Sequence, residues 1–426
     1  MIRAFLQKCR YAIRRLFTLP LVNPRGHYDH NARLLLLNTA MIGVPSGGIM
    51  AFLPIFMARL GASSTLIGTL SSAPALLAIL VFIPAAVIAE RRSDHVRVRV
   101  TFAKLGRLCF LACALIPFVI PTAYLPMVLI LIWVLKTFPD CVASTAWTSV
   151  IARAIPAERR AHLNSTRWAL LSIVSAISSA FFGWLLDSVS FPLNYQLVFF
   201  ISFAFGWLDP LIFSHIRVPK MERPEHRKAL GTAARAKEYL SPVIHHRPFL
   251  LFSAITIAYR IALSLPTPLF GLFWVEELDA PDTLIGLRGT VGYVALVVGY
   301  LFWGRMANRM GRRLLLISAA LGLALYPIAT ALSPSAIWLL PAAVIWGLTA
   351  SGIDIGLFDI MLTAMPDERQ PLFAAVWNMI SNGAIFVGPL LGAALAQNTS
   401  RGTALLIAGL LQMLMTIPFI FLPHGT

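Results

Sequence analysis

Twelve stretches of about 20 mostly apolar residues follow one another along the chain, separated by short polar segments. A helix of that length can cross the hydrocarbon core of a bilayer, and lipid favours helices because their backbone groups are hydrogen-bonded internally. Charged residues make up 12% of the 426 residues, whereas a soluble domain carries roughly 25%. The sequence therefore predicts an all-α integral membrane protein. The predicted transmembrane helices cover residues 34–58, 66–89, 101–120, 125–150, 167–187, 194–216, 249–275, 284–303, 314–332, 336–361, 372–396 and 403–422.

Basic residues lie mainly on one side of these spans. If the amino terminus is cytoplasmic, 30 of the 35 Lys and Arg residues fall in or beside cytoplasmic segments, whereas Glu276, Glu277, Asp279 and Asp282 fall in one outer loop. Cytoplasmic loops of membrane proteins carry such a basic excess. We therefore expect a multi-pass protein of the cell membrane with both termini in the cytoplasm. The formal net charge of +17 then has the anionic inner leaflet of the bilayer as its partner, and nucleic-acid binding is not expected.

Residues 1–33 form a basic cytoplasmic segment before the first span. Arg and Lys interrupt its apolar residues every few positions, and no small-residue cleavage site follows an apolar core, so the segment does not read as a cleaved signal peptide. Two interpretations stay open. The segment is either an interfacial helix with Phe5, Leu6, Leu16 and Phe17 toward lipid or a frayed basic tail.

A polar segment, residues 217–247, divides the chain into two sets of six spans and predicts a cytoplasmic linker. The expected domains are a first six-helix bundle, residues 34–216, and a second one, residues 248–426. LGASSTLIG (60–68) and LDAPDTLIG (278–286) follow the first span of each half.

The connection between the fourth and fifth spans repeats as well. Its shared residues are Pro156, Glu158 and Arg159 in the first half and Pro366, Glu368 and Arg369 in the second. Matched landmarks in the same order indicate a parallel internal repeat.

Residues 304–313, GRMANRMGRR, join the second and third spans of the second half. This string is similar to the cytoplasmic signature loop of the major facilitator superfamily, G-x-x-x-D-R-x-G-R-[RK], except that Asn308 stands at the usual Asp position. Together with twelve spans, a six-plus-six division and a basic central loop, the resemblance covers the chain after residue 33. It implies two six-helix bundles and secondary transport by alternating access.

The same loop is a candidate cytoplasmic gate. Gly304 and Gly311 allow a tight turn and a close approach of helices. Arg309 and Arg312 can pair with acids at the inner ends of neighbouring spans, and Asp359 is the expected partner. The alternative is that the loop only anchors this side in the cytoplasm. The candidate gate residues are Gly304, Asn308, Arg309, Gly311, Arg312 and Asp359.

Four charged residues lie deep inside predicted spans, namely Lys136, Asp140, Arg260 and Asp354. A charge near the bilayer centre costs about 2.5–3.5 kcal/mol, so it needs a partner, water or a function. Resemblance to the superfamily implies that the first and fourth spans of each half line a central cavity, and the four residues lie on those spans. For Lys136 and Asp140 the alternative is mutual neutralisation within one helix, because they are i, i+4 neighbours.

Arg260 has no acid within a turn of its own span and cannot lose its proton, so it is expected to hold an anion or a carboxylate. Asp354 can titrate, and we expect the two residues to act together in proton coupling. Asn38, Tyr259 and Asn378 complete the candidate cavity residues, although each alone is more often a packing residue. Charges nearer the span ends are expected to anchor the helices at the interface; these are Glu90, Arg107, Asp187, Asp209 and Arg288.

These features predict a secondary active transporter that moves a small organic solute, coupled to protons and acting as a monomer. No phosphate-binding loop for ATP is present, and the histidines lie in loops, tails or span ends. The four cysteines form no metal-binding or disulfide pattern, so neither an enzyme nor a bound metal or cofactor is expected. The fifth span lacks the G-x-x-x-G-P-x-x-G string of the superfamily's drug–proton antiporters, which weakens drug antiport. A receptor that does not transport, or a lipid translocator, remains the alternative on the same fold.

Overall fold

The computed structural model describes residues 27–90, 92–218, 243–366 and 370–422. The segment 1–26, most of the predicted linker and the matched pair Glu368 and Arg369 lie outside the described residues. The described part of the chain contains twelve helical segments long and apolar enough to cross a membrane. The predicted number of spans and the all-α architecture are therefore confirmed.

The first half consists of six spans, the first of which is broken. Its helices are α2 (His27–Gly47), α3 (Ile49–Arg59), α4 (Ser64–Glu90), α5 (His95–Leu115) with a 3-10 turn η1 (Ile116–Phe118), α6 (Leu125–Ala154), α7 (Ala157–Ser188) and α8 (Leu193–Phe213). The break falls at Gly48, where an added Cβ would lie 2.3 Å from the hydroxyl oxygen of Ser202. That hydroxyl instead accepts a hydrogen bond from the backbone N–H of Ile49, so a neighbouring span satisfies the backbone at the break.

The second half has the same plan, again with a broken first span. Its helices are α10 (Arg247–Ser264), α11 (Thr267–Leu272) with the π-turn η2 (Phe273–Glu277), α12 (Asp282–Met310), α13 (Arg312–Ala331), η3 (Ala336–Trp338) with α14 (Leu339–Ala364), α15 (Gln370–Asn398), and α16 (Arg401–Leu414) with η5 (Ile417–Phe421). Pro266 and Pro268 start α11, and proline cannot continue a helix because it lacks the N–H donor.

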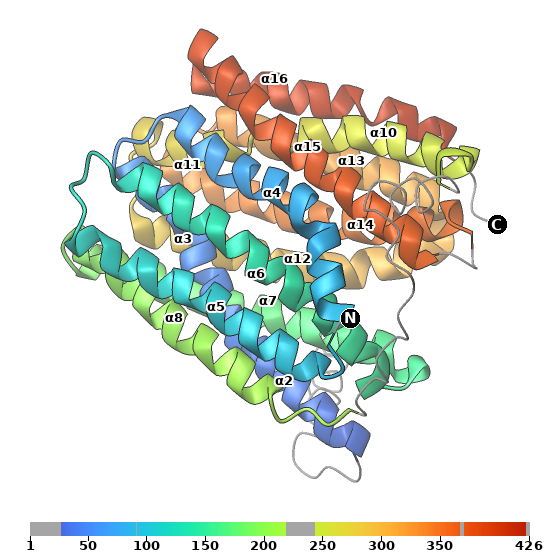
Figure 1. Ribbon diagram of the computed structural model, residues 1–426. Helices are drawn as coiled ribbons and strands as arrows, with labels where there is room; N and C mark the ends of the chain where they lie inside the picture. Colours follow the sequence, from blue (N-terminus) through green and yellow to red (C-terminus); the bar gives the residue numbers. More distant parts are fainter. Residues whose placement is uncertain (1–26, 91, 219–242, 367–369, 423–426) are drawn as a thin grey trace, which may run out of the picture.

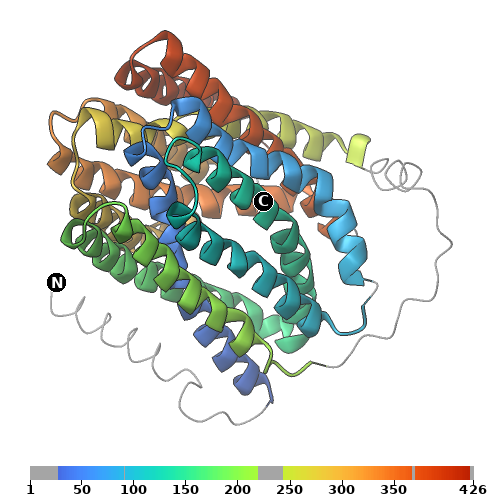
Figure 2. The ribbon, with the colours of Figure 1, turned by 60° about the vertical axis from the view of Figure 1, so that its left-hand side comes forward.

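Equivalent helices pack together in each half. In the first half α2 packs on α7 and α8, α5 on α6 and α8, and α4 on α6; in the second half α10 packs on α15 and α16, α13 on α14 and α16, and α12 on α14. The most extensive contacts between the halves join α4 with α15 and α7 with α12. Figures 1 and 2 show the first half, blue to green, beside the second half, yellow to red. The helix packing therefore follows the parallel repeat seen in the sequence.

The repeated strings form matching turns. Gly61 has φ +75° and Asp279 has φ +45°, so both residues adopt the left-handed conformation that glycine tolerates best and Asp next best. The N–H groups of the next residues, Ala62 and Ala280, donate back to the preceding helical turns, to Met57 and Trp274 respectively. The two copies therefore share a backbone conformation as well as a sequence pattern.

The last glycine of each string lies where the two halves touch. A Cβ on Gly68 would lie 3.1 Å from the carbonyl oxygen of Pro389, and a Cβ on Gly286 would lie 2.4 Å from that of Ser179. Each contact joins a second span of one half to a fifth span of the other. The repeated glycines thus lie in the two largest helix contacts between the halves.

Candidate functional site

A cavity of about 520 Å³ lies between the two halves. Residues of α3 and α7 line it from the first half, and residues from most helices of the second half complete it. Its surface is mainly apolar and aromatic. The aromatic lining residues are Phe52, Phe270, Trp274, Tyr293, Tyr326 and Trp346, and the charged ones are Arg288 and Asp354.

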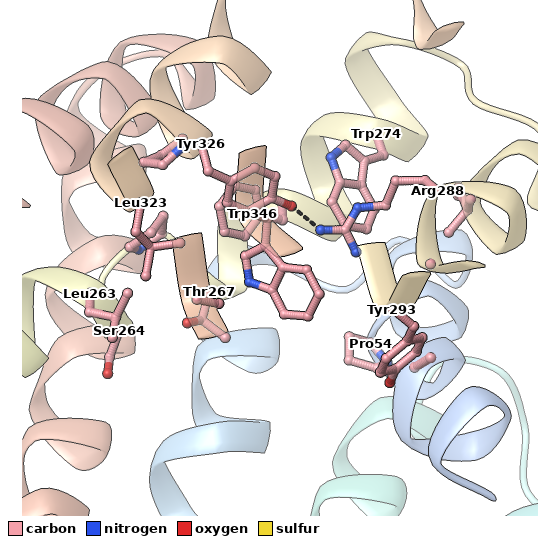
Figure 3. A pocket seen from close by; sticks show the side chains of 18 of the residues that line it. Pro54, Leu263, Ser264, Thr267, Trp274, Arg288, Tyr293, Leu323, Tyr326 and Trp346 are labelled. Atoms are coloured by element: carbon pink, nitrogen blue, oxygen red, sulfur yellow. Dashed lines mark hydrogen bonds between the residues drawn. The ribbon is translucent and has the colours of Figure 1, made fainter. Parts of the chain in front are cut away.

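Arg288, on α12, enters the cavity inside a cage of aromatic rings (Figure 3). Its guanidinium carbon lies 4.6 Å from the ring centroid of Trp274, 5.3 Å from that of Tyr326 and 5.6 Å from that of Trp346. One terminal nitrogen also donates a hydrogen bond to the hydroxyl of Tyr326. Cation–π contacts of this kind stabilise a cation that has left bulk water. Arg288 is therefore a cavity residue, and the expectation that it anchors a span end is wrong.

Asp354, on α14, lines the same cavity and accepts a 2.7 Å hydrogen bond from the hydroxyl of Tyr300. Arg260 stacks on Trp377, with its guanidinium carbon 5.1 Å from the ring centroid. Within the described residues no ion pair under 4.0 Å joins Arg260 to Asp354, although their charges interact through space. The structure thus brings the two predicted partners near each other without a direct bond.

Lys136 and Asp140 pair with each other along α6. The Lys136 ammonium lies 4.8 Å from the ring centroid of Trp133 and 5.4 Å from that of Phe110. Both residues lie outside the lining of the cavity between the halves. Their arrangement matches the alternative of mutual neutralisation within one helix.

Asn38 belongs to a buried polar network inside the first half and not to the cavity. Its side chain is fully buried and its amide donates to the carboxylate of Asp209 on α8. The same carboxylate pairs with Arg99 at 2.8 Å and with Arg107 at 2.9 Å, both on α5. Asp209 and Arg107 therefore do not anchor span ends as expected, because they neutralise each other between the third and sixth spans.

Tyr259 and Asn378 also lie outside the lining of this cavity. Tyr259 is fully buried, packs 5.0 Å from Phe419 between ring centroids, and accepts a 3.1 Å hydrogen bond from Gln412. Gln412 itself lines the cavity, so Tyr259 contacts it indirectly. Asn378 is exposed, and its backbone carbonyl accepts a hydrogen bond from Asn382.

The signature loop forms contacts within the second half. The Nε atom of Arg312 lies 4.0 Å from Asp359, the partner expected from the sequence, and another guanidinium nitrogen donates to Thr363. Gly311 has φ +77° in the turn between α12 and α13, as a tight turn requires. Gly304 has open space around it and makes no close helix approach, so that expectation is wrong. Arg309 is exposed, and the side chain of Asn308 is not among those described.

At the opposite end of α12, side chains bridge the two halves, and we call this region the closed end. Arg59 lies 3.3 Å from Asp282, and the hydroxyl of Tyr195 donates to the same carboxylate at 2.8 Å. Asp187 accepts hydrogen bonds from the backbone N–H groups of Asp282 and Thr283 at 3.1 and 2.7 Å. A carboxylate is well placed there because the first N–H groups of a helix have no partner within it. The acidic outer loop in the sequence was the available signal for this contact.

Small residues let α7 and α12 touch beside the closed end. The hydroxyl of Ser179 donates to the carbonyl of Gly286 at 3.0 Å, and that of Thr290 donates to the carbonyl of Ala176 at 2.7 Å. A Cβ on Gly183 would lie 2.9 Å from the Cα of Gly286. The helices therefore meet backbone to backbone, as is common where small residues line a membrane helix interface.

The sequence of this chain resembles known proteins. The family model of the Major Facilitator Superfamily matches residues 35–270 and again residues 252–425. A "Multi-drug resistance efflux pump PmrA homolog" of Lactococcus lactis subsp. lactis (strain IL1403) is 28% identical over 122 residues, which are 29% of this chain and 30% of the relative. The match thus spans less than a third of that relative's length.

Solved structures of transporters superpose over nearly the whole chain. A crystal structure of a mutant of the nucleoside transporter NupG has a TM-score of 0.73 at 12% identity, covering 92% of this chain and 99% of that one. A POT family transporter in complex with 5-aminolevulinic acid has a TM-score of 0.74 at 12% identity, covering 95% and 99%. A bacterial homolog of the human lysosomal transporter Spinster, in an inward-facing and unoccupied conformation, has a TM-score of 0.65 at 16% identity, covering 93% and 95%. With a family model that matches both halves, the chain belongs to the Major Facilitator Superfamily.

Proposed function

We propose that this transporter moves a small organic solute by secondary active transport through the cavity between its halves. The observation that carries the proposal is the position of that cavity, which residues of both halves line beside a closed end that spans them. Alternating access needs such a site, because rocking of one half against the other can then expose it to either side.

We infer the orientation from the charges. The closed end adjoins the acidic residues Glu276 and Glu277. Arg309 lies at the opposite end of α12, and Arg312 and Arg313 lie at the adjoining start of α13. The positive-inside rule then places the closed end outside a cell membrane and both termini in the cytoplasm. In this orientation the closed end faces the outside, and the basic face meets the anionic inner leaflet.

We further infer that Asp354 carries the coupling proton. It lines the cavity, can bind or release a proton, and has Tyr300 as its hydrogen-bond donor and Arg260 as the neighbouring cation. Arg260 cannot deprotonate, so of these two residues only Asp354 can exchange a proton. Asp140 is the next candidate, although its pairing with Lys136 supports a structural role.

The test is transport by the full chain in proteoliposomes without ATP. Ligands are first found by thermal stabilisation of the purified protein across a solute library. Each stabilising ligand is then assayed for counterflow and for uptake under an imposed proton gradient. Counterflow of at least one ligand is expected, and proton-driven accumulation would identify the coupling. If stabilising ligands show neither flux nor exchange, the chain is a receptor; if it moves labelled lipid instead, it is a lipid translocator.

A further inference from the structure

We propose that Arg288 is the binding group for the carboxylate of an organic anion whose apolar or aromatic body fills the cavity. This inference rests on the proposed function, because it takes the cavity between the halves as the substrate site. It adds the chemical class of the substrate and the residue that selects it.

The charge balance of the cavity favours an anion. No acidic side chain lies within 4.0 Å of Arg288 among the described residues. Asp354, the acid of the cavity lining, already has a hydrogen bond from Tyr300 and a cationic neighbour in Arg260. Arg288 therefore brings a positive charge that the surrounding protein leaves without a counter-ion, and a charge in an apolar site calls for one.

The guanidinium is held in place before any ligand binds. Trp274, Tyr326 and Trp346 surround it at 4.6 to 5.6 Å, and one terminal nitrogen donates to the Tyr326 hydroxyl (Figure 3). The Nε atom of the same guanidinium is buried and makes no hydrogen bond with the described residues. A fixed guanidinium with a free N–H face binds a carboxylate with little loss of side-chain entropy.

The rest of the cavity suits an apolar body. Its lining is mainly hydrocarbon and includes the ring faces of Phe270 and Tyr293 as well as Leu323 and Ile353. A volume of about 520 Å³ falls within the range typical of sites for drug-sized ligands. A substrate with one carboxylate and an aromatic or aliphatic body would satisfy both the cation and the apolar walls.

A cationic or zwitterionic substrate fits this arrangement less well. A cation would be repelled by Arg288 and would have to compete with Arg260 and Tyr300 for Asp354. A zwitterion would need both charged residues at once, which requires its ammonium to displace those same partners from Asp354. The monoanion is therefore the class that the charges favour.

The experiment measures binding to the purified full chain in detergent, by thermal shift and by quenching of tryptophan fluorescence. The probes are three carboxylates of increasing size, benzoate, 2-naphthoate and indole-3-acetate, each beside its neutral carboxamide, with benzylamine and phenylalanine as the cation and the zwitterion. The variants are Arg288→Gln, Arg288→Lys and Tyr326→Phe. The matched control is Arg305→Gln, which removes an exposed arginine of the same helix that bonds only its own helix backbone among the described residues.

We expect at least one carboxylate to bind the unchanged protein about tenfold more tightly than its carboxamide does. Arg288→Gln should abolish that preference, a loss of at least about tenfold, because a hydrogen bond to a charged group disappears. Arg288→Lys should keep part of the preference, Tyr326→Phe should weaken it several-fold, and Arg305→Gln should leave it unchanged. If Arg288→Gln does not fold, the graded loss expected in Tyr326→Phe and Arg288→Lys still tests the cage.

The inference is overturned if carboxylates and carboxamides bind equally, if benzylamine or phenylalanine binds most tightly, or if the preference survives in Arg288→Gln. Its failure is separate from failure of the proposed function. Binding of a carboxylate without counterflow would support the anion site and contradict transport. Counterflow of neutral or cationic ligands alone would support transport and contradict the anion site.

Discussion

Arg59 of the first half lies 3.3 Å from Asp282 of the second half, and Tyr195 donates to the same carboxylate. Arg59 directly precedes the first copy of the repeated string, and Asp282 belongs to the second copy. The ion pair therefore joins the two copies of the repeat across the boundary between the halves. In an alternating-access cycle it must break whenever the closed end opens.

Asp282→Asn should favour opening of the closed end. Losing the charge weakens the bonds from Arg59 and Tyr195, and a hydrogen bond to a charged group contributes about 1.5–3 kcal/mol. We expect the ratio of open to closed protein to rise at least about tenfold. Spin-label distances across the closed end, in protein reconstituted in lipid, measure this ratio.

The control for this prediction is Arg401→Gln. Arg401 pairs with Glu276 at 2.6 Å on the same side of the bundle, but both residues belong to the second half. Its loss should leave the distance distribution unchanged. An unchanged distribution in Asp282→Asn as well would show that the ion pair does not hold the closed end.

Gly286→Ala should also favour the open state. An added Cβ would lie 2.4 Å from the carbonyl oxygen of Ser179 on the facing helix. Overpacking of this kind typically destabilises a packed state by about 1–3 kcal/mol. The strain exists only where α7 and α12 touch, so the closed end should open more often. Gly383→Ala is the matched control, because open space surrounds Gly383. Equal accessibility of a reporter cysteine at the closed end in both variants would contradict the prediction.

Asp354→Asn should abolish the pH dependence of uptake while leaving exchange of bound solute largely intact. The substitution keeps the size of the side chain and a hydrogen-bond acceptor for Tyr300 but removes the titrating group. Proton-driven uptake and counterflow in proteoliposomes measure the two activities separately. Asp359→Asn, which changes an acid on the same helix outside the cavity, should retain normal pH dependence. If Asp354→Asn also retains it, proton coupling lies elsewhere.

Arg260 and Asp354 should be energetically coupled. Arg260→Ala leaves Asp354 without its cationic neighbour and Trp377 without its stacking partner, so it should weaken ligand binding. The double variant with Asp354→Asn should be milder than the sum of the single changes, by about 0.5–3 kcal/mol. A double-mutant cycle on ligand affinity measures this term, and strict additivity would show that the residues act independently.

Arg312→Ala should have a small effect on stability in the described conformation. Its pair with Asp359 is 4.0 Å long and both side chains are at least a third exposed, and exposed ion pairs contribute about 0–1 kcal/mol. Thermal unfolding of the purified variant measures the effect. A large destabilisation would indicate contacts of the signature loop beyond this pair.

The spans, the repeat and the Arg312–Asp359 pair could be predicted because each depends on residues near in sequence or on a known loop pattern. The aromatic cage of Arg288 could not, since its rings come from three other spans and Arg288 lies close to a span end. The prediction that Asp209 anchors a span end was wrong for the same reason, because its partners lie on another span. Its two arginines lie about a hundred residues earlier on α5, and a sequence alone does not show which faces of two helices meet. An arginine with no acid within one helical turn, in an apolar window, was the signal that could have pointed to Arg288.

Asp282 and Arg288 lie six residues apart on one unbroken helix, which corresponds to about 9 Å along its axis. Asp282, which bridges the halves at the closed end, and Arg288, which lines the cavity, therefore move together as parts of α12. A solute that binds Arg288 and shifts it would also shift α12, and so would change the geometry of the ion pair between Arg59 and Asp282. In this way occupancy of the cavity can affect the closed end through a single helix.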